Sequence, residues 1–199
     1  MGNVNRYIAL EGVDGSGKST VSAALARRLG DLGHQVVTVR EPGGTAVGEV
    51  VRGLLLDSES LDVRAEALLF AAQRAELAAG VVAPALSEGK WVISDRTYYS
   101  SIAYQGRARG LGESEVREIN EWGLAGVVPD LVFVLDVEPG HALDRQDRAD
   151  RIGREGVDFQ ASVRDGYLSL AAADPERVFL LDGALTVAEL VDQILEKVM

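Results

Sequence analysis

A glycine-rich segment near the N-terminus contains the residues best suited to hold phosphate. Residues 12–19 read Gly-Val-Asp-Gly-Ser-Gly-Lys-Ser and match the pattern G-x-x-x-x-G-K-[ST] in full. Glycines let the backbone turn its N–H groups toward an anion, and Lys18 neutralises the outer phosphates of a nucleotide. The Ser19 hydroxyl is a suitable ligand for Mg²⁺. The pattern therefore predicts an ATP phosphate site formed by Gly12, Val13, Asp14, Gly15, Ser16, Gly17, Lys18, Ser19 and Thr20.

Two charged segments later in the chain suit the binding of a second phosphate group. Residues 40–45 read Arg-Glu-Pro-Gly-Gly-Thr, in which proline and paired glycines fix a tight backbone around Glu41 and Pro42. The second pair of charges, Asp95 and Arg96, ends the third expected strand. An aspartate there can hold Mg²⁺ through water, and an adjacent arginine can grip a phosphate with its planar fork. The alternatives are a plain surface loop for the first segment and a structural ion pair for the second.

Aromatic and amide side chains in two further segments suit a flat base. Phe70 and Arg74 are four residues apart, so a helix would place them on one face, where a ring and a guanidinium can sandwich a base. Ser101, Tyr104 and Gln105 follow the second charged segment, and the glutamine amide offers a base edge both a donor and an acceptor. The alternatives are an ordinary core position for the phenylalanine and a plain helix with a buried tyrosine for the later segment.

An arginine-rich segment, at about residues 144–156, repeats Asp-Arg at Arg145, Arg148 and Arg151. One interpretation is a lid whose arginines stabilise the charge on a transferring phosphoryl group, while its closure excludes water. The other is a solvated helix on which aspartates and arginines pair. The phosphate loop and the arginine suited to a second phosphate favour the lid.

Short apolar runs alternate with helical patterns and would position all of these residues. The runs expected to be buried strands are residues 7–10, 35–39, 91–94, 131–135 and 178–181. Helical spacing is found at residues 21–32, 47–56, 64–79, 113–124, 163–173 and 187–198. This alternation predicts an α/β fold with a mostly parallel sheet and helices on both faces. Ligands bind at the carboxyl ends of such strands, where we expect Glu11, Glu41, Asp95, Asp136 and Asp182.

The composition restricts the classes of function. The chain has 199 residues, of which 47% are hydrophobic, and this favours one domain with a well-buried core. Cysteine is absent and there are two histidines, so we expect neither a disulfide framework nor a multi-histidine zinc site. A net charge of −11 disfavours binding to nucleic acid or anionic membranes. No signal peptide and no run of about 18 apolar residues is evident, so we expect a cytoplasmic protein.

These pieces, in this order, resemble the thymidylate kinase family. The matching segments are residues 11–20, 40–45, Phe70 with Arg74, 95–96, 103–106, 129–137 and 150–152, which together span nearly the whole chain. The phosphate loop is shared widely, but its combination with Arg-Glu-Pro-Gly-Gly-Thr, Asp-Arg and the later Asp-Arg-Ile is far more specific. The resemblance implies a single-domain, three-layer P-loop NTPase fold with a five-stranded parallel sheet and a short arginine-bearing lid. It also implies a homodimer and the reaction ATP + dTMP → ADP + dTDP with Mg²⁺.

The resemblance also assigns roles by position. It implies that Phe70 stacks on thymine, that Arg74 contacts the base edge and that Arg96 holds the acceptor 5′-phosphate. Asp14 would lie near the acceptor sugar, and Tyr104 would disfavour a ribose 2′-hydroxyl. The expected dTMP contacts are Glu41, Pro42, Phe70, Arg74, Arg96, Ser101, Tyr104 and Gln105, and the expected Mg²⁺ ligands are Ser19 and Asp95.

The position of the catalytic arginines divides the family. Here the phosphate loop has no arginine, whereas the predicted lid has several, which resembles the lid-arginine type common among bacterial members. Arg151 ranks first among them because it lies in the Asp-Arg-Ile match. The expected catalytic set is Lys18, Asp14, Arg96, Arg151 and Arg148. One departure is Thr97, at a position where relatives often have an aromatic residue.

Three other functions fit parts of the pattern. A kinase for another monophosphate would share the scaffold, and a panel of acceptor nucleotides would distinguish it. A GTPase switch should carry an N-K-x-D guanine motif, which the sequence lacks. An ATPase that depends on nucleic acid conflicts with the net charge of −11.

Overall fold

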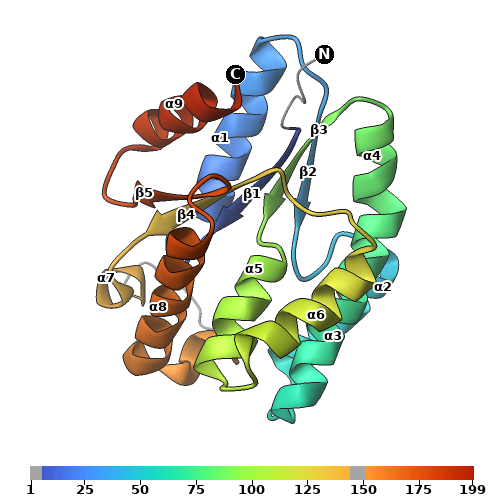
Figure 1. The fold of residues 1–199 in the computed structure, drawn as a ribbon, viewed down its shortest axis with the longest axis vertical. Coiled ribbons are helices and arrows are strands. Elements are labelled where there is room, and N and C mark those ends of the chain that lie inside the picture. The colour runs from blue at the N-terminus through green and yellow to red at the C-terminus, as the bar shows by residue number, and fades with distance from the viewer. Residues whose placement is uncertain (1–5, 144–150) are drawn as a thin grey trace.

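A parallel sheet forms the centre of this computed structural model, which describes residues 6–143 and 151–199. Its strand order is β2-β3-β1-β4-β5 (Figure 1). The strands are β1 (Tyr7–Glu11), β2 (Val36–Arg40), β3 (Trp91–Asp95), β4 (Leu131–Asp136) and β5 (Val178–Asp182). In the register, Ala9 of β1 lies opposite Ser94 of β3 and Val132 of β4. Because each pairing is parallel, the carboxyl ends of the strands meet at one edge of the sheet.

Helices connect consecutive strands, as parallel pairing requires. The α-helices are α1 (Lys18–Asp31), α2 (Ala46–Asp57), α3 (Val63–Leu77), α4 (Ala83–Ser87), α5 (Tyr98–Ser101), α6 (Glu113–Leu124), α7 (Pro139–Leu143), α8 (Val157–Ala173) and α9 (Val187–Val198). Two π-helical turns, η1 (Ala78–Val82) and η2 (Ile102–Ala108), continue α3 into α4 and extend α5. A short 3-10 turn, η3 (Gly153–Glu155), precedes α8.

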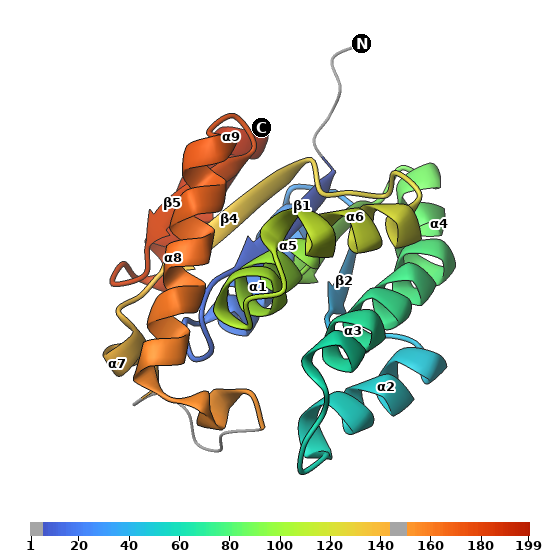
Figure 2. The same ribbon diagram turned by 60° about the horizontal axis from the view of Figure 1, so that its bottom comes forward.

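The two faces of the sheet bury different helices, which gives three layers. Alternate strand residues such as Ile8 and Phe133 pack with Leu25 of α1 and Ile194 of α9. The opposite face is covered by α3 with its continuation α4, by α5 with η2, and by α8, while α6 lies outside them against α3 and η2 (Figures 1 and 2). α2 packs on α3 and lies beyond it, away from the sheet (Figure 2).

The fold class predicted from the sequence is confirmed, with corrections to several boundaries. Every expected strand is present, and α6 and α9 have the expected bounds. Residues 98–108 are helical, although no regular pattern there was assigned to a helix. The helix expected at 163–173 begins earlier, at Val157, and the one expected to end at residue 79 continues through η1 into α4. Glu41 lies one residue beyond β2, whereas the other expected acidic residues end their strands.

The continuous helix Val63–Ser87 is long and apolar enough to pass a membrane-span test by length and composition, which the sequence analysis did not expect. Core helices of water-soluble proteins pass the same test. Glu66, Gln73 and Arg74 lie on its buried face and bond to other elements, as residues of a core helix do.

Candidate functional site

The main cavity of the described residues lies where the strands end and has a volume of about 550 Å³. Its walls come from the loop after β1, the turns after β2 and β3, and the helices α2, α3, α5 and η2. The residues that line it are Asp14, Gly15, Gly17, Lys18, Ser19, Thr20, Arg40, Glu41, Pro42, Arg52, Leu56, Phe70, Asp95, Arg96, Ser100, Ser101, Tyr104, Gln105 and Ile152. Residues predicted to bind the two nucleotides therefore share one cavity.

Glycine is required in the phosphate loop by its backbone. Gly12, Gly15 and Gly17 have φ angles of 137°, 81° and 94°, in a region that other residues rarely adopt. A Cβ on Gly12 would lie 2.7 Å from the carbonyl oxygen of Leu135, so the close approach of β4 also excludes a side chain. Gly17 precedes the first turn of α1, whose N-terminus therefore opens onto the cavity. Of the predicted loop residues, Gly12, Val13 and Ser16 lie inside the loop and do not line the cavity.

Lys18 is buried at the base of the loop. Its Nζ donates to the carbonyl oxygens of Gly12 (3.2 Å) and Val13 (2.8 Å) and to Ser16 Oγ (3.3 Å). Burial lowers the pKa of its ammonium group to about 8, and the positive charge of Arg96 acts in the same direction. An anion in the cavity would offset both effects, so the site favours a phosphate beside this lysine.

Arg96 is held against the phosphate loop by several acceptors. Its guanidinium forms an ion pair with Asp14 and donates to the Gly12 carbonyl (3.1 Å) and Ser100 Oγ (2.9 Å). Burial alone would raise the pKa of the Asp14 carboxyl, but the charges of Arg96 and Lys18 outweigh it and lower that pKa. Asp14 therefore stays ionised between two cations, in the loop between the two predicted phosphate sites.

Glu11, fully buried at the end of β1, organises the turn that carries Arg96. Its carboxylate accepts hydrogen bonds from the Thr97 backbone (2.7 Å), the Thr97 hydroxyl (2.8 Å), Ser100 Oγ (2.5 Å) and the Tyr167 hydroxyl (2.8 Å). These bonds stabilise the left-handed backbone of Arg96, whose φ is 74°. The sequence analysis placed Glu11 at a strand end without a role. The hydroxyl of Thr97 provides a contact that an aromatic ring at this position would lack.

Ser19 and Asp95 meet beside Lys18. Ser19 Oγ donates to Asp95 Oδ2 at 2.5 Å, and both side chains line the cavity. In the described part of the chain, no group of three or more histidine, cysteine or acidic side chains could hold a metal. Mg²⁺ commonly takes one or two protein oxygens together with phosphate and water, so these oxygens fit Mg²⁺ bound mainly through nucleotide phosphates.

The far wall of the cavity is aromatic and polar. Phe70, Tyr104 and Gln105 line it together with Ser101. The Tyr104 ring centroid lies 5.1 Å from the Arg96 guanidinium carbon, and its hydroxyl accepts from Arg96 at 3.3 Å. Burial raises the pKa of the Tyr104 hydroxyl, which therefore stays protonated and able to donate a hydrogen bond. This wall has the apolar area and the few polar groups that a nucleobase and sugar need.

Arg74 lies behind that wall and does not line the cavity. It is 2% exposed, and its Nε forms an ion pair with Glu41 at 2.5 Å. Its other nitrogens donate to Asn120, to Ser101 Oγ (3.1 Å) and to the Thr97 carbonyl (3.2 Å). Burial raises the pKa of the Glu41 carboxyl, and the Arg74 charge opposes that rise. In this structure the pair joins the turns after β2 and β3, and the expected contact of Arg74 with a base stays a prediction.

The predicted lid is described in part. Arg145 and Arg148 lie outside the described residues. Arg151 does not line the cavity: its Nε donates to the Leu55 carbonyl at 2.9 Å, and its Nη2 lies 2.7 Å from Glu66 Oε2. The next residue, Ile152, does line the cavity. The expected contact of Arg151 with a transferring phosphoryl group stays a prediction.

Several lining residues were missed by sequence reasoning. Arg52 of α2 donates to the Pro42 carbonyl at 2.8 Å and adds a second cation on the side of the turn after β2. Leu56, Ser100 and Arg40 also line the cavity. Arg52 lies on the helix that directly follows the Arg-Glu-Pro-Gly-Gly-Thr turn, and that position was a usable signal. Arg40 begins that same turn and Ser100 directly precedes Ser101, whereas Leu56 carries no distinctive pattern.

A glycine-rich loop between the first strand and a helix, in a parallel sheet with helices on both faces, defines a P-loop nucleoside-triphosphate-binding protein. The profile of the thymidylate kinase family matches residues 10–194. The chain therefore belongs to the thymidylate kinase family.

Similar proteins support this assignment over nearly the full length. The chain is 48% identical to a thymidylate kinase of Pelotomaculum thermopropionicum, covering 90% of this chain and 86% of that protein. It is 46% identical to a thymidylate kinase of Clavibacter michiganensis, with coverages of 89% and 87%. The crystal structure of thymidylate kinase from Ehrlichia chaffeensis superposes with a TM-score of 0.82 at 32% identity, covering 98% of both chains.

Proposed function

We propose that this protein transfers the γ-phosphoryl group of ATP to dTMP and so produces dTDP and ADP. One observation supports this above all: the phosphate loop with Lys18, the arginine Arg96 and an aromatic wall all line a single cavity. ATP phosphates on the loop would face a monophosphate held by Arg96. The family membership supports the choice of dTMP as acceptor.

Phosphoryl transfer requires positioning and charge neutralisation more than covalent help from the protein. In the proposed complex, the N–H groups of residues 12–20 bind the ATP phosphates and Lys18 neutralises their outer charge. Arg96 binds the 5′-phosphate of dTMP and fixes the attacking oxygen in line with the γ-phosphorus. Asp14 pairs with Arg96 and orients that guanidinium, and its charge also interacts with Lys18.

We further propose Mg²⁺ as the cofactor, held by Ser19 Oγ and, through water, by Asp95. When bound, Mg²⁺ supplies charge neutralisation on the phosphates that are transferred and released. The 2.5 Å contact between Ser19 and Asp95 supports this site, because it brings two oxygen ligands next to the phosphate loop.

The remaining expected roles belong to the same proposal. Phe70 stacks on thymine, Tyr104 fills the space that a 2′-hydroxyl would need, and Gln105 faces the base edge. Arg148 and Arg151 are the proposed catalytic arginines, which would stabilise the charge on the transferring phosphoryl group. We also propose that residues 1–199 form one domain and that the protein acts in the cytoplasm without nucleic acid or membrane partners.

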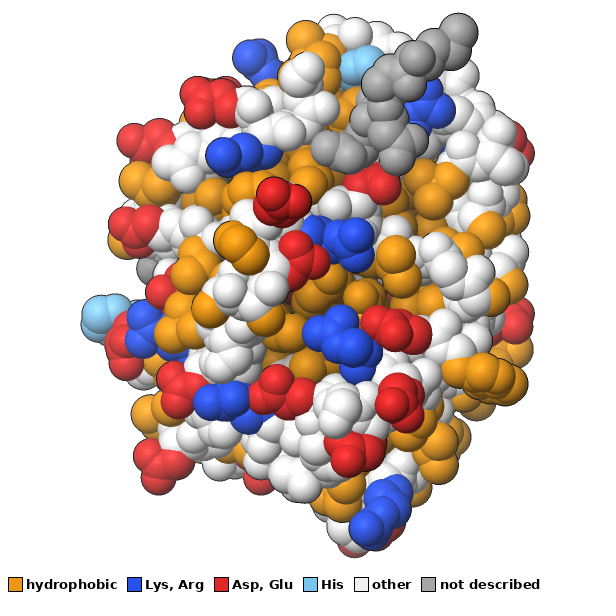
Figure 3. All heavy atoms as spheres, in the orientation of Figure 1, with side chains coloured by type: hydrophobic (Ala, Val, Ile, Leu, Met, Phe, Trp, Pro, Cys, Tyr) orange, Lys and Arg blue, Asp and Glu red, His pale blue; other side chains and the backbone are white. Residues whose placement is uncertain are grey.

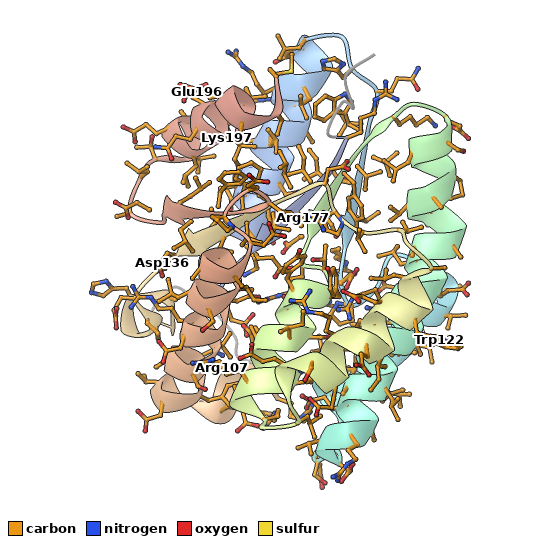
Figure 4. All side chains as sticks on the ribbon, viewed as in Figure 1. Arg107, Trp122, Asp136, Arg177, Glu196 and Lys197 are labelled. Carbon is orange, nitrogen blue, oxygen red and sulfur yellow. The ribbon has the colours of Figure 1, made fainter. Side chains whose placement is uncertain are left out.

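The proposed assembly is a homodimer. Exposed apolar side chains lie on α2, α3 and α6, which pack side by side; they are Val47, Val50, Leu54, Leu68, Ile119 and Trp122. Trp122 is 88% exposed and projects from α6 at the edge of the molecule (Figure 4). A stripe of this kind costs free energy in water and favours a protein partner.

A coupled assay of ADP release tests the reaction directly. dTMP, dUMP, dCMP and thymidine are each offered with ATP and Mg²⁺, and we expect dTMP to give the highest kcat/KM. The Lys18→Ala variant should lose turnover by several orders of magnitude while it keeps its thermal unfolding transition. Turnover of dTMP no better than that of the other acceptors would contradict the assignment.

A further inference from the structure

Glu66, in the first turn of α3, is 1% exposed and lies behind the aromatic and polar wall of the cavity, where it contacts Gln105. Oε1 of Glu66 accepts a hydrogen bond from Gln105 Nε2 at 2.8 Å. Arg109 Nε lies 3.3 Å from Oε1, and Arg151 Nη2 lies 2.7 Å from Oε2. Glu66 therefore forms ion pairs with two arginines and a hydrogen bond with the Gln105 amide.

This contact settles the orientation of the Gln105 side-chain amide. The oxygen and nitrogen of an amide are close to interchangeable in shape, so neighbouring groups decide which way it points. The Glu66 carboxylate accepts from arginines on both of its oxygens, so the Gln105 atom beside it is the donor of the amide, its NH₂ group. Within the described residues, no hydrogen bond reaches Gln105 Oε1, and Gln105 lines the cavity. The amide oxygen is the atom left to face the ligand.

An acceptor at this point selects among pyrimidines. The Watson–Crick edge of thymine has a donor at its centre, the N3–H group, whereas cytosine has an acceptor lone pair at the same position. We propose that Glu66 is a specificity-determining positioning residue, which fixes the Gln105 amide oxygen toward the base so that N3–H of thymine is accepted and N3 of cytosine is repelled. This inference rests on the proposed function.

The ion pairs of Glu66 are a separate contribution. Arg109 also pairs with Glu155 at 2.6 Å and stacks over the Phe159 ring at 4.8 Å, and neither partner lines the cavity. Loss of the Glu66 charge would leave two arginines without it and would lower stability and turnover for every acceptor. A purely structural role therefore predicts equal losses with dTMP and dCMP, whereas the amide role predicts a change in their ratio.

The test measures the ratio of kcat/KM for dTMP to kcat/KM for dCMP. In Glu66→Gln, the new amide can present either its oxygen or its NH₂ to Gln105, so the orientation is no longer imposed. We expect the ratio to fall by about ten-fold, the size of one mismatched buried hydrogen bond. Most of the fall should come from dTMP.

The matched control is Arg109→Gln, which removes an ion pair of Glu66 and leaves the Glu66–Gln105 hydrogen bond. Its ratio should stay within about two-fold of the parent. If Glu66→Gln does not fold, the double variant Glu66→Gln/Arg109→Gln is used, because it loses one charge of each sign. Its ratio of kcat/KM values is then compared with the ratio for Arg109→Gln alone. A ratio that does not change between these two, in protein that unfolds cooperatively on heating, overturns the role of Glu66. No turnover of dTMP by the parent protein overturns the proposed function as well.

Discussion

In the free protein, Lys18 donates to acceptors within its own loop, although the loop is suited to hold an anion. Three oxygens, of Gly12, Val13 and Ser16, lie within 3.3 Å of its Nζ. Neutral acceptors only partly replace water around a buried ammonium, and the pKa falls to about 8. Free Lys18 is thus close to half protonated at a mildly alkaline pH.

This pKa predicts how ATP binding depends on pH. Phosphate oxygens favour the protonated lysine, so above pH 8 the free protein must take up a proton in order to bind. We expect the affinity for ATP to fall as pH rises from 7.5 to 9.5, by up to about ten-fold per unit. Isothermal calorimetry in two buffers of different ionisation enthalpy would detect the uptake. Lys18→Met should bind weakly with a flatter profile, and a constant affinity for the parent protein across this range would contradict the prediction.

Phe70 was interpreted in two ways, as a ring that stacks on the base and as an ordinary core residue, and one substitution can distinguish them. It is 9% exposed and packs in the apolar core, yet it also lines the cavity. We expect Phe70→Ala to raise the KM for dTMP by about ten-fold, because a base stacked on a ring loses that contact. The control is Phe133→Leu in β4, which should lower the melting temperature and leave that KM unchanged. A lower melting temperature with an unaltered KM for Phe70→Ala would make it an ordinary core residue.

At the scale of elements, the sequence predicted what depends on periodicity and missed what depends on tertiary contacts. α6 and α9 show clear amphipathic spacing and were predicted with their observed bounds. Residues 98–108 contact α6 and α8 and also line the cavity. Because they meet several different surroundings, they show no simple amphipathic spacing. α3 continues past Gly80 and Pro84 through the π-helical turn η1, which directly precedes Pro84 in the first turn of α4.

The closing helix offers a stability test that leaves the cavity untouched. Thr186 caps α9: its Oγ1 accepts from the Glu189 backbone at 3.3 Å, and Glu189 Oε2 accepts from the Thr186 backbone at 2.9 Å. We expect Thr186→Ala to lower the free energy of unfolding by about 1 kcal/mol, measured by urea denaturation, with kcat unchanged. Glu196→Ala, an exposed position on the same helix, should change it by less than about 0.5 kcal/mol. Equal effects of the two variants would mean that the cap contributes nothing.

For the whole molecule, the sequence located most of the site but could not supply its supporting contacts. Local motifs lie at strand ends, and parallel pairing alone brings them together, so Lys18, Asp95 and Arg96 were found without a structure. Glu11 and Glu66 act through side chains that are 86 and 39 residues away, and no spacing rule connects them. The direction of Arg151 likewise depends on packing against α2.

The surface of the molecule points to its assembly. The face in Figure 3 intersperses acidic and basic side chains, with hydrophobic groups between them. On α2, the exposed residues Val47, Val50 and Leu54 follow i, i+3, i+7 spacing and so form one stripe. Leu68 of α3 and Trp122 of α6 are also exposed, and α3 packs on both α2 and α6. A second copy of the chain could cover the stripe through a two-fold axis, as an isologous interface requires.

The expected result is a dimer by sedimentation velocity at micromolar concentration. Trp91 is buried in each protomer and Trp122 is exposed, so dilution through the dissociation constant should shift tryptophan emission to longer wavelength as Trp122 enters water. Leu54→Glu places a charge in the stripe and should weaken the dimer at least ten-fold, because an unpaired charge would have to be buried. Leu180→Glu in the edge strand β5, which is also exposed, should leave the dissociation constant unchanged. Equal weakening by both substitutions, or a monomeric parent protein, would show that α2, α3 and α6 do not form the interface.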